Sequence, residues 1–195
     1  MAFLITPTSE LEAVNECLEN IGQAPVSTIA GDLGVDTQIA LNFVRRVNRE
    51  LQAAGWYWNT EKNYPLTPGG DDRILLPSNT LAVNTAGVDA NKDYIQRGSL
   101  LYDRDTYSYT FSGVVHVELT LGFPFEELPE TARRYIALRA ARIFQDRIEG
   151  TTSQSDESDE ASALVVLKAD QLRTEDFNVL SDSYGMFKTL NRSGY

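Results

Sequence analysis

The apolar residues near the start of the chain recur at the spacing of an α-helix. One set is separated by three, four and three residues and therefore shares a helix face: Leu11, Val14, Leu18 and Ile21. Thr8 or Ser9 can cap this helix, and Glu12, three residues after Ser9, completes the spacing of a capping box. Gly22 follows it as a stop signal, and Pro25 cannot continue a helix. The pattern predicts a first amphipathic helix.

A second helix is expected between Asp36 and Gly55. Its apolar face is formed by residues at helical spacing: Ile39, Ala40, Phe43, Val44, Val47, Leu51 and Ala54. Asp36 or Thr37 should cap this helix, and Gly55 should end it. Both tryptophans of the chain follow at once, in Trp56-Tyr57-Trp58. Large aromatic side chains usually anchor a core or an interface, so these three residues are expected to form a structural junction.

The pattern changes to that of β-strands over residues 56–121. Residues 106–111 alternate between polar and aromatic, and Ser112-Gly113 should turn this segment into a strand over 114–121. One face of the second strand is apolar: Val115, Val117, Leu119 and Leu121. The sequence therefore predicts an antiparallel hairpin within a small meander that has one buried face.

Helical spacing returns after Pro129. A third helix is expected over 130–149, and an acidic, Ser/Thr-rich spacer over 150–159 reads as a mobile loop. A last helix should run from about Asp156 past Leu172, with these residues on its inner side: Ala161, Leu164, Val165, Leu167 and Leu172.

These elements predict an α+β fold, in which a four-helix-bundle-like α domain carries an inserted antiparallel β-rich domain. The expected divisions are a first helical half (1–57), the β-rich insertion (58–123), a second helical half (124–190) and a tail (191–195).

The composition argues against a membrane-spanning, a nucleic-acid-binding and a secreted protein. The hydrophobic fraction of 42% is enough for a core, and no stretch approaches the ~18 apolar residues of a membrane span. The net charge of −11 disfavours affinity for nucleic-acid phosphates, which requires clustered Lys and Arg. Met1–Pro7 lacks the pattern of a signal peptide, so the protein is expected to be soluble and made in the cytoplasm.

Few residues are suited to chemistry. His116 is the only histidine and reads as a half-exposed strand residue, while Cys17 reads as a small buried hydrophobe. Glu126 and Glu130 could form the carboxylate pair of a glycan hydrolase, but acidic residues before a helix are explained as well by its dipole. We expect no catalytic residue, no cofactor and no metal site. Five arginines on the third helix are candidates for ion pairs between subunits, with solvation as the alternative: Arg133, Arg134, Arg139, Arg142 and Arg147.

Core and turn residues stand in a recognisable order: Ala13-Val14-Asn15, Leu18, Ile21-Gly22, Pro25-Val26, and Gly55 to Glu61. Their combination resembles the tail tubular protein A family of short-tailed bacteriophages, and the similarity runs essentially from end to end. The resemblance implies a helical bundle that bears a β-rich domain, in agreement with the patterns above. It offers no catalytic motif.

The resemblance also implies a structural role in the virion tail. Family members are adaptors, or gatekeepers, that form a dodecameric ring below the portal protein and bind the hexameric tubular nozzle on the other side. Tail fibres attach near the nozzle junction, and genomic DNA passes through the ring only in transit. The chain's C-terminal segment could order on the portal, as adaptor tails can, and its candidate docking residues are Lys188, Asn191, Arg192 and Tyr195. A tail-mounted glycan or peptidoglycan hydrolase and a helical interaction module without a phage role remain as alternatives.

Overall fold

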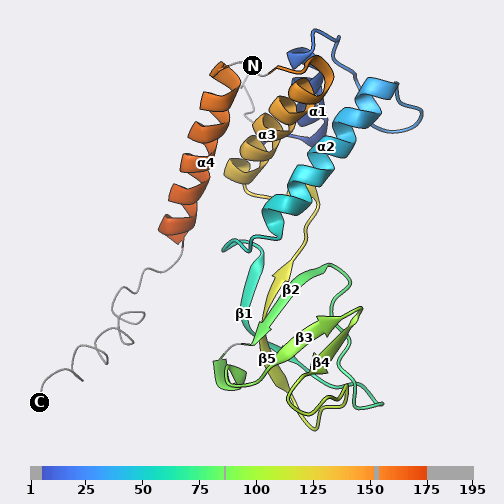
Figure 1. The fold of residues 1–195 in the computed structure, drawn as a ribbon, viewed down its shortest axis with the longest axis vertical. Helices are drawn as coiled ribbons and strands as arrows, with labels where there is room; N and C mark the ends of the chain where they lie inside the picture. The colour runs from blue at the N-terminus through green and yellow to red at the C-terminus, as the bar shows by residue number, and fades with distance from the viewer. Residues whose placement is uncertain (1–5, 86, 152–153, 175–195) are drawn as a thin grey trace, which may run out of the picture.

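The computed structural model describes residues 6–85, 87–151 and 154–174 (Figure 1). Within these residues the helices gather at one end of the molecule and the strands at the other. The helices are α1 (Glu10–Asn20), α2 (Val35–Gln52), α3 (Glu130–Glu149) and α4 (Gln154–Thr174). Short 3-10 turns cover Gly87–Asp89 and Phe125–Glu127. The α+β class expected from the sequence is confirmed.

The strands form two small antiparallel sheets. β1 (Thr60–Leu66), β5 (Val115–Leu121) and β2 (Thr80–Thr85) pair in that order, so the last strand lies in the centre. β3 (Tyr94–Arg97) and β4 (Leu100–Asp103) form a separate hairpin. Side chains of β5 alternate as predicted, because Val115, Val117 and Leu119 are buried and Leu121 is half-buried. This face carries the core of the β part.

The predicted hairpin between residues 106–111 and 114–121 is wrong. β5 pairs with β1 and β2, while residues 106–111 contribute only isolated bridges. Asp103 is the physical reason, because its carboxylate accepts hydrogen bonds from the backbone N–H groups of Asp105 and Thr106 and from the Thr106 hydroxyl. This local capping closes a turn at the end of β4 and diverts the alternating segment from a strand.

The ends of the first two helices follow local hydrogen bonding. The capping box of α1 is confirmed, since Ser9 and Glu12 bond each other's backbone N–H groups. The predicted cap of α2 is wrong: Gly34 is its N-cap residue, and Asp36 and Thr37 lie within the first turn. α2 also ends at Gln52, before Ala54, because the backbone and side chain of Gln52 are engaged by later residues.

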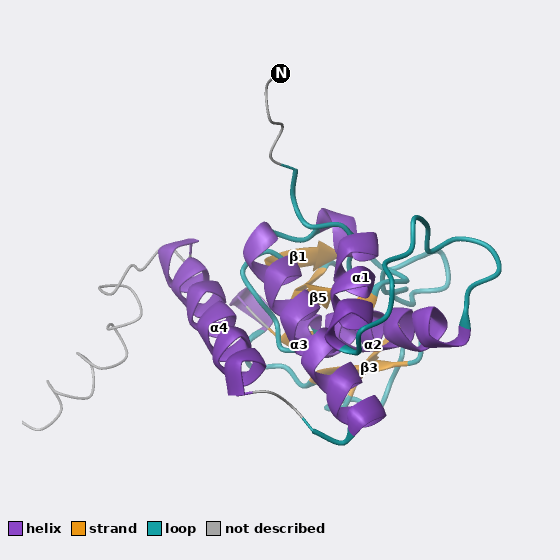
Figure 2. Cartoon of the chain, turned by 90° about the horizontal axis from the view of Figure 1, so that it is seen from above, coloured by secondary structure: helices purple, strands orange, loops and turns teal. Residues whose placement is uncertain are grey.

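α3 is the central helix of the bundle. α1 and α2 pack against it on one side and α4 on another, as the view from above shows (Figure 2). The fully buried ring of Phe144 on α3 lies edge-on to Phe43 of α2, with ring centroids 6.0 Å apart. The apolar residues of the β part form a second core, built around Ile74, Leu101 and Val117. The division into domains at 57/58 and 123/124 stays a prediction.

α4 differs from the expectation in two respects. It begins at Gln154, so the acidic residues expected in a loop over 150–159 lie mostly in its first two turns. Its inner side is narrower than predicted: Ala163 and Leu167 are buried and Leu164 is half-buried. Three residues predicted on that side are exposed instead: Ala161, Val165 and Leu172. α3 covers only one stripe of α4, and the remaining apolar residues face outward.

Candidate functional site

The aromatic junction lies where the helical part meets the β part. Trp56 and Trp58 are half-buried and pack against the helical core. The indole Nε1 of Trp56 donates to the carbonyl oxygen of Leu51 at 2.8 Å, which fixes the ring against the end of α2. The Tyr57 hydroxyl donates to Asp170 Oδ2 at 3.0 Å, so the same segment also contacts α4. The three aromatic residues therefore touch two helices directly after the chain leaves α2.

Asn59 connects three segments at this junction, and sequence reasoning did not single it out. Its side chain is 1% exposed. Its Oδ1 accepts a hydrogen bond from the Trp56 N–H at 2.7 Å, and its Nδ2 donates to the carbonyl oxygens of Gln52 (2.8 Å) and Leu121 (2.9 Å). Both amide hydrogens are thus used. The end of α2, the aromatic turn and the end of β5 are bonded to one side chain.

The chain passes from the helical part to the β part after α2 and returns after β5. Gln52 fixes the returning segment at Phe123. It is buried, and its side-chain amide pairs with both backbone groups of Phe123: Nε2 donates to the carbonyl at 2.9 Å and Oε1 accepts from the N–H at 2.7 Å. Nε2 also donates to Asn48 Oδ1 at 2.7 Å. The sequence held a signal for this pair, because Asn48 and Gln52 continue the buried stripe of Ala40 and Val44 at four-residue spacing.

Gly55 is required by the geometry of the same turn. Its φ of +74° lies in the left-handed region, which side chains disfavour. A Cβ at this position would also lie 3.3 Å from Thr60 Oγ1 and 3.4 Å from Thr120 Oγ1. The backbone of the junction therefore depends on glycine for both conformation and space.

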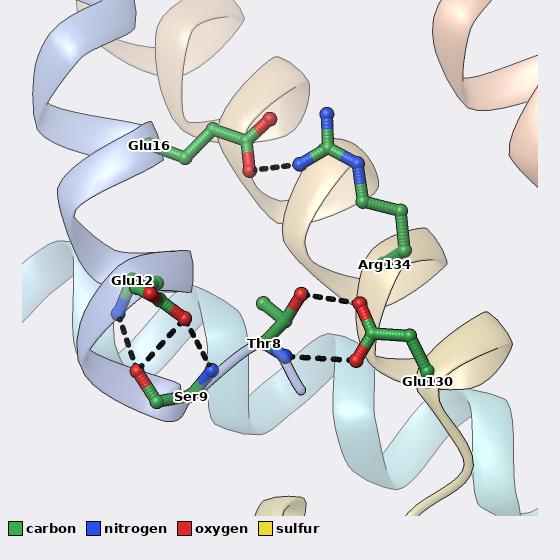
Figure 3. Close-up of polar contacts among 6 residues, drawn as sticks. All are labelled: Thr8, Ser9, Glu12, Glu16, Glu130 and Arg134. Atoms are coloured by element: carbon green, nitrogen blue, oxygen red, sulfur yellow. Dashed lines mark hydrogen bonds and ion pairs between the residues drawn. The ribbon is translucent and has the colours of Figure 1, made fainter. Parts of the chain in front are cut away.

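Four of the five candidate arginines on α3 are engaged within the chain. Arg134 pairs with Glu16 of α1 at 2.7 Å (Figure 3). Arg139 and Arg142 both pair with Glu160, which ties α4 to α3. The guanidinium of Arg133 donates to the backbone carbonyls of Thr8, Glu126 and Leu128.

Arg147 differs from these four. It is exposed near the end of α3, and no ion pair of the described residues involves it. The role of the five arginines at a subunit interface stays a prediction, and Arg147 is the member that could take part without breaking an ion pair among the described residues.

The candidate carboxylates hold the segment that leads into α1. Glu130 accepts hydrogen bonds from the Thr8 N–H at 2.8 Å and from the Thr8 hydroxyl at 2.6 Å (Figure 3). Glu126 Oε1 accepts from the Glu10 N–H at 3.3 Å. Both carboxylates thus bind backbone N–H groups at the start of a neighbouring helix, where negative charge is stabilised. This arrangement gives no support to a hydrolytic carboxylate pair.

Burial raises the pKa of the Glu16 carboxyl above its ordinary value, and the neighbouring Arg134 offsets this only in part. The folded state therefore binds a proton at Glu16 more readily than the unfolded chain does, and the resulting stability is present at low pH and lost as the pH rises through the folded pKa. We therefore expect the wild type to gain stability relative to Glu16→Gln as the pH falls from 7 to 4, measured as the difference between their free energies of unfolding. Urea unfolding of both proteins at the two pH values measures this difference, and a constant difference would contradict it.

The other candidates for chemistry are accounted for by structure. Cys17 is fully buried, and burial raises the pKa of its thiol to about 12, so it is a buried hydrophobe as expected. His116 is half-buried in β5, and its backbone N–H donates to Asp89 Oδ2 at 2.8 Å. In the described part of the chain no cluster of three or more His, Cys, Asp or Glu side chains could hold a metal ion. Among the helices described, none is long and apolar enough to cross a membrane.

The candidate docking residues of the C-terminal segment, which are Lys188, Asn191, Arg192 and Tyr195, lie outside the described residues.

Comparison with known proteins relates this arrangement to phage tails. A family model described as "Tail tubular protein" matches residues 11–177. A relative, Tail tubular protein A of Klebsiella phage KP34, is 30% identical over 153 residues, which cover 78% of this chain and 80% of the relative. The match spans the helical part and the β part together.

Proposed function

The chain belongs to the tail tubular protein family and is a structural component of a virion tail; from this premise we propose that it is the adaptor, or gatekeeper, of that tail. In this role, copies of the chain form a ring, expected to be a dodecamer, between the portal protein and the tubular nozzle. The ring encloses part of the channel for DNA ejection, and tail fibres attach nearby. We propose no enzymatic activity for it.

The junction is the observation that carries the proposal. Two chain crossings connect the helical part to the β part, and buried amides bond both of them: Asn59 bonds residues 52, 56 and 121, and Gln52 bonds residue 123. Satisfied buried polar groups specify one arrangement, because any other leaves them unpaired at a cost of about 1–3 kcal/mol each. A subunit that must fit identical neighbours and two different partners needs one shape.

The charge of the chain agrees with a channel through which DNA moves without binding. Each subunit brings a formal charge of −11, and acidic surfaces repel the phosphate backbone. Repulsion between subunits then has to be offset at their contacts. The exposed Arg147 supports the proposed role of α3 at such a contact, where its guanidinium could pair with a carboxylate of a neighbour.

Assembly on the portal tests the proposal. The purified chain, mixed with the portal protein of the same virion, should form ring-shaped particles seated on the portal, visible by negative-stain electron microscopy. Deletion of residues 188–195 should weaken this docking, because we propose that Lys188, Asn191, Arg192 and Tyr195 contact the portal.

The shortened chain serves as its own folding control, since its circular dichroism and melting temperature should match those of the full chain. Absence of rings with the full chain would overturn the adaptor proposal. Unchanged docking of a well-folded shortened chain would overturn the role of the C-terminal segment alone.

A further inference from the structure

The outer side of α4 carries an apolar stripe that no other part of the described residues covers. Val165 is 67% exposed and Leu172 is 55% exposed, and both lie in line with the exposed Ala161 at helical spacing. Val166, also exposed, lies beside this line. The opposite side of α4 is already occupied, because Ala163 and Leu167 pack against the bundle. α4 thus presents apolar residues to two sides, and within residues 6–85, 87–151 and 154–174 only one of these sides is packed against another element.

A second surface that the described residues leave exposed lies on the first half of α2. Four of its residues follow each other at spacings of four, three and four and therefore share a face: Val35, Ile39, Asn42 and Arg46. Val35 is 75% exposed. The other three line a shallow pocket together with Phe43, and the Arg46 guanidinium lies over the Phe43 ring, 4.8 Å from its centroid. The pocket therefore has an apolar floor and a cationic rim.

These two surfaces lie on opposite edges of the bundle. Figure 1 shows α4 at one edge and the first half of α2 at the other, with α3 between them, and the view from above agrees (Figure 2). A closed ring of identical subunits is built from head-to-tail contacts, in which two different faces of the chain meet. A chain with uncovered apolar faces at both edges has the arrangement that such contacts require.

The charges of the two helices are complementary. α2 carries three arginines against one aspartate and one glutamate, and its excess of positive charge is small, because Arg45 pairs with Glu10 of α1 and Arg46 pairs with Glu50. α4 carries five acidic residues against two basic ones. Contacts between these two faces would therefore bring a weakly cationic helix to an anionic one, while contacts between two copies of α4 would repel.

We propose that the outer stripe of α4 in one subunit packs on the α2 surface of the next, with Val165 and Leu172 against the pocket at Ile39, Asn42 and Phe43. This proposal rests on the ring proposed above and names the seam between its subunits. Apolar residues form the centre of the contact, and charged residues such as Arg46 form its rim, as in other protein interfaces.

Variants that break one face at a time test the seam. Val165→Asp/Leu172→Asp removes the α4 face, and Val35→Asp/Asn42→Asp removes the α2 face. Both act on exposed side chains, so circular dichroism and melting temperature should match the wild type. Leu75→Asp is the matched control, because it adds an acidic charge at an exposed leucine of the β part, away from both faces.

In the portal assay, the wild type and Leu75→Asp should form rings, and each two-site variant alone should form none. In an equimolar mixture, the intact α4 face of one variant can pack on the intact α2 face of the other, but neither has a further intact face to continue the ring. Native mass spectrometry should therefore detect pairs but no closed rings. Rings formed by either two-site variant would overturn the seam while leaving the adaptor proposal intact. Failure of the unmodified chain to form rings would overturn the adaptor proposal and the seam with it.

Discussion

Replacement of Asn59 by alanine is expected to lower the free energy of unfolding by about 3 kcal/mol. The side chain is 1% exposed and makes three hydrogen bonds, each to a backbone group of a different segment. Alanine leaves the Trp56 N–H and the Leu121 carbonyl without this partner, and an unpaired buried polar group costs about 1–3 kcal/mol; the Gln52 carbonyl keeps its hydrogen bond from the Gly55 N–H. Water that enters the space left by the side chain can bond some of these groups, so the expected loss of stability is smaller than the sum of their separate costs. Urea unfolding followed by circular dichroism measures the change.

Asn84→Ala is the matched control for this variant, because Asn84 is an exposed asparagine on β2. Its effect should stay within about 0.5 kcal/mol. If Asn59→Ala proved as mild as Asn84→Ala, the amide network would not be what joins the two parts, and the argument for a subunit of one fixed shape would lose its main support.

Trp56→Ala should have a similarly large effect, about 2–4 kcal/mol, and should reduce ring formation on the portal. Truncation of a fully buried large aromatic costs about 3–5 kcal/mol, and the value is set lower here because Trp56 is only half-buried. The variant also loses the hydrogen bond from the indole to the Leu51 carbonyl. Unfolding in urea gives the stability, and electron microscopy with the portal gives the assembly.

Two further variants distinguish the packing of the Trp56 ring from its hydrogen bond and from the loss of an aromatic residue in general. Trp56→Phe keeps an aromatic ring but not the Nε1 donor, so it should retain part of the stability. Tyr107→Ala removes an aromatic ring that is 82% exposed and should change the free energy of unfolding by no more than about 0.5 kcal/mol. A Trp56→Ala protein that is as stable as Tyr107→Ala and still assembles would contradict a structural role for this residue.

Periodic and local features could be predicted from the sequence. The capping box at Ser9 and Glu12, the buried face of β5 and the burial of Cys17 all followed from residue type and spacing. These features depend on neighbours close in the chain or on one repeated pattern. The family could be inferred for a similar reason, because its residues stand in a fixed order along the chain.

The connections between distant segments could not be predicted in the same way. Asn59 is of a residue type that usually lies at the surface, and its burial depends on a partner at Leu121. The spacing of Gln52 indicates a buried position, but its partner Phe123 lies 71 residues away in the sequence. A turn at Asp103 stands where a strand was expected, because the Asp103 carboxylate accepts hydrogen bonds from the backbone N–H groups of Asp105 and Thr106. Val165 was predicted to face inward, since apolar spacing does not reveal whether the partner belongs to the same chain.

Electron cryomicroscopy of the intact virion tail at residue resolution tests the central claim most directly. We expect a ring of copies of this chain between the portal and the tubular nozzle, with α4 of each copy against α2 of the next. A tail in which the portal contacts the nozzle directly, and this chain lies elsewhere, would contradict it.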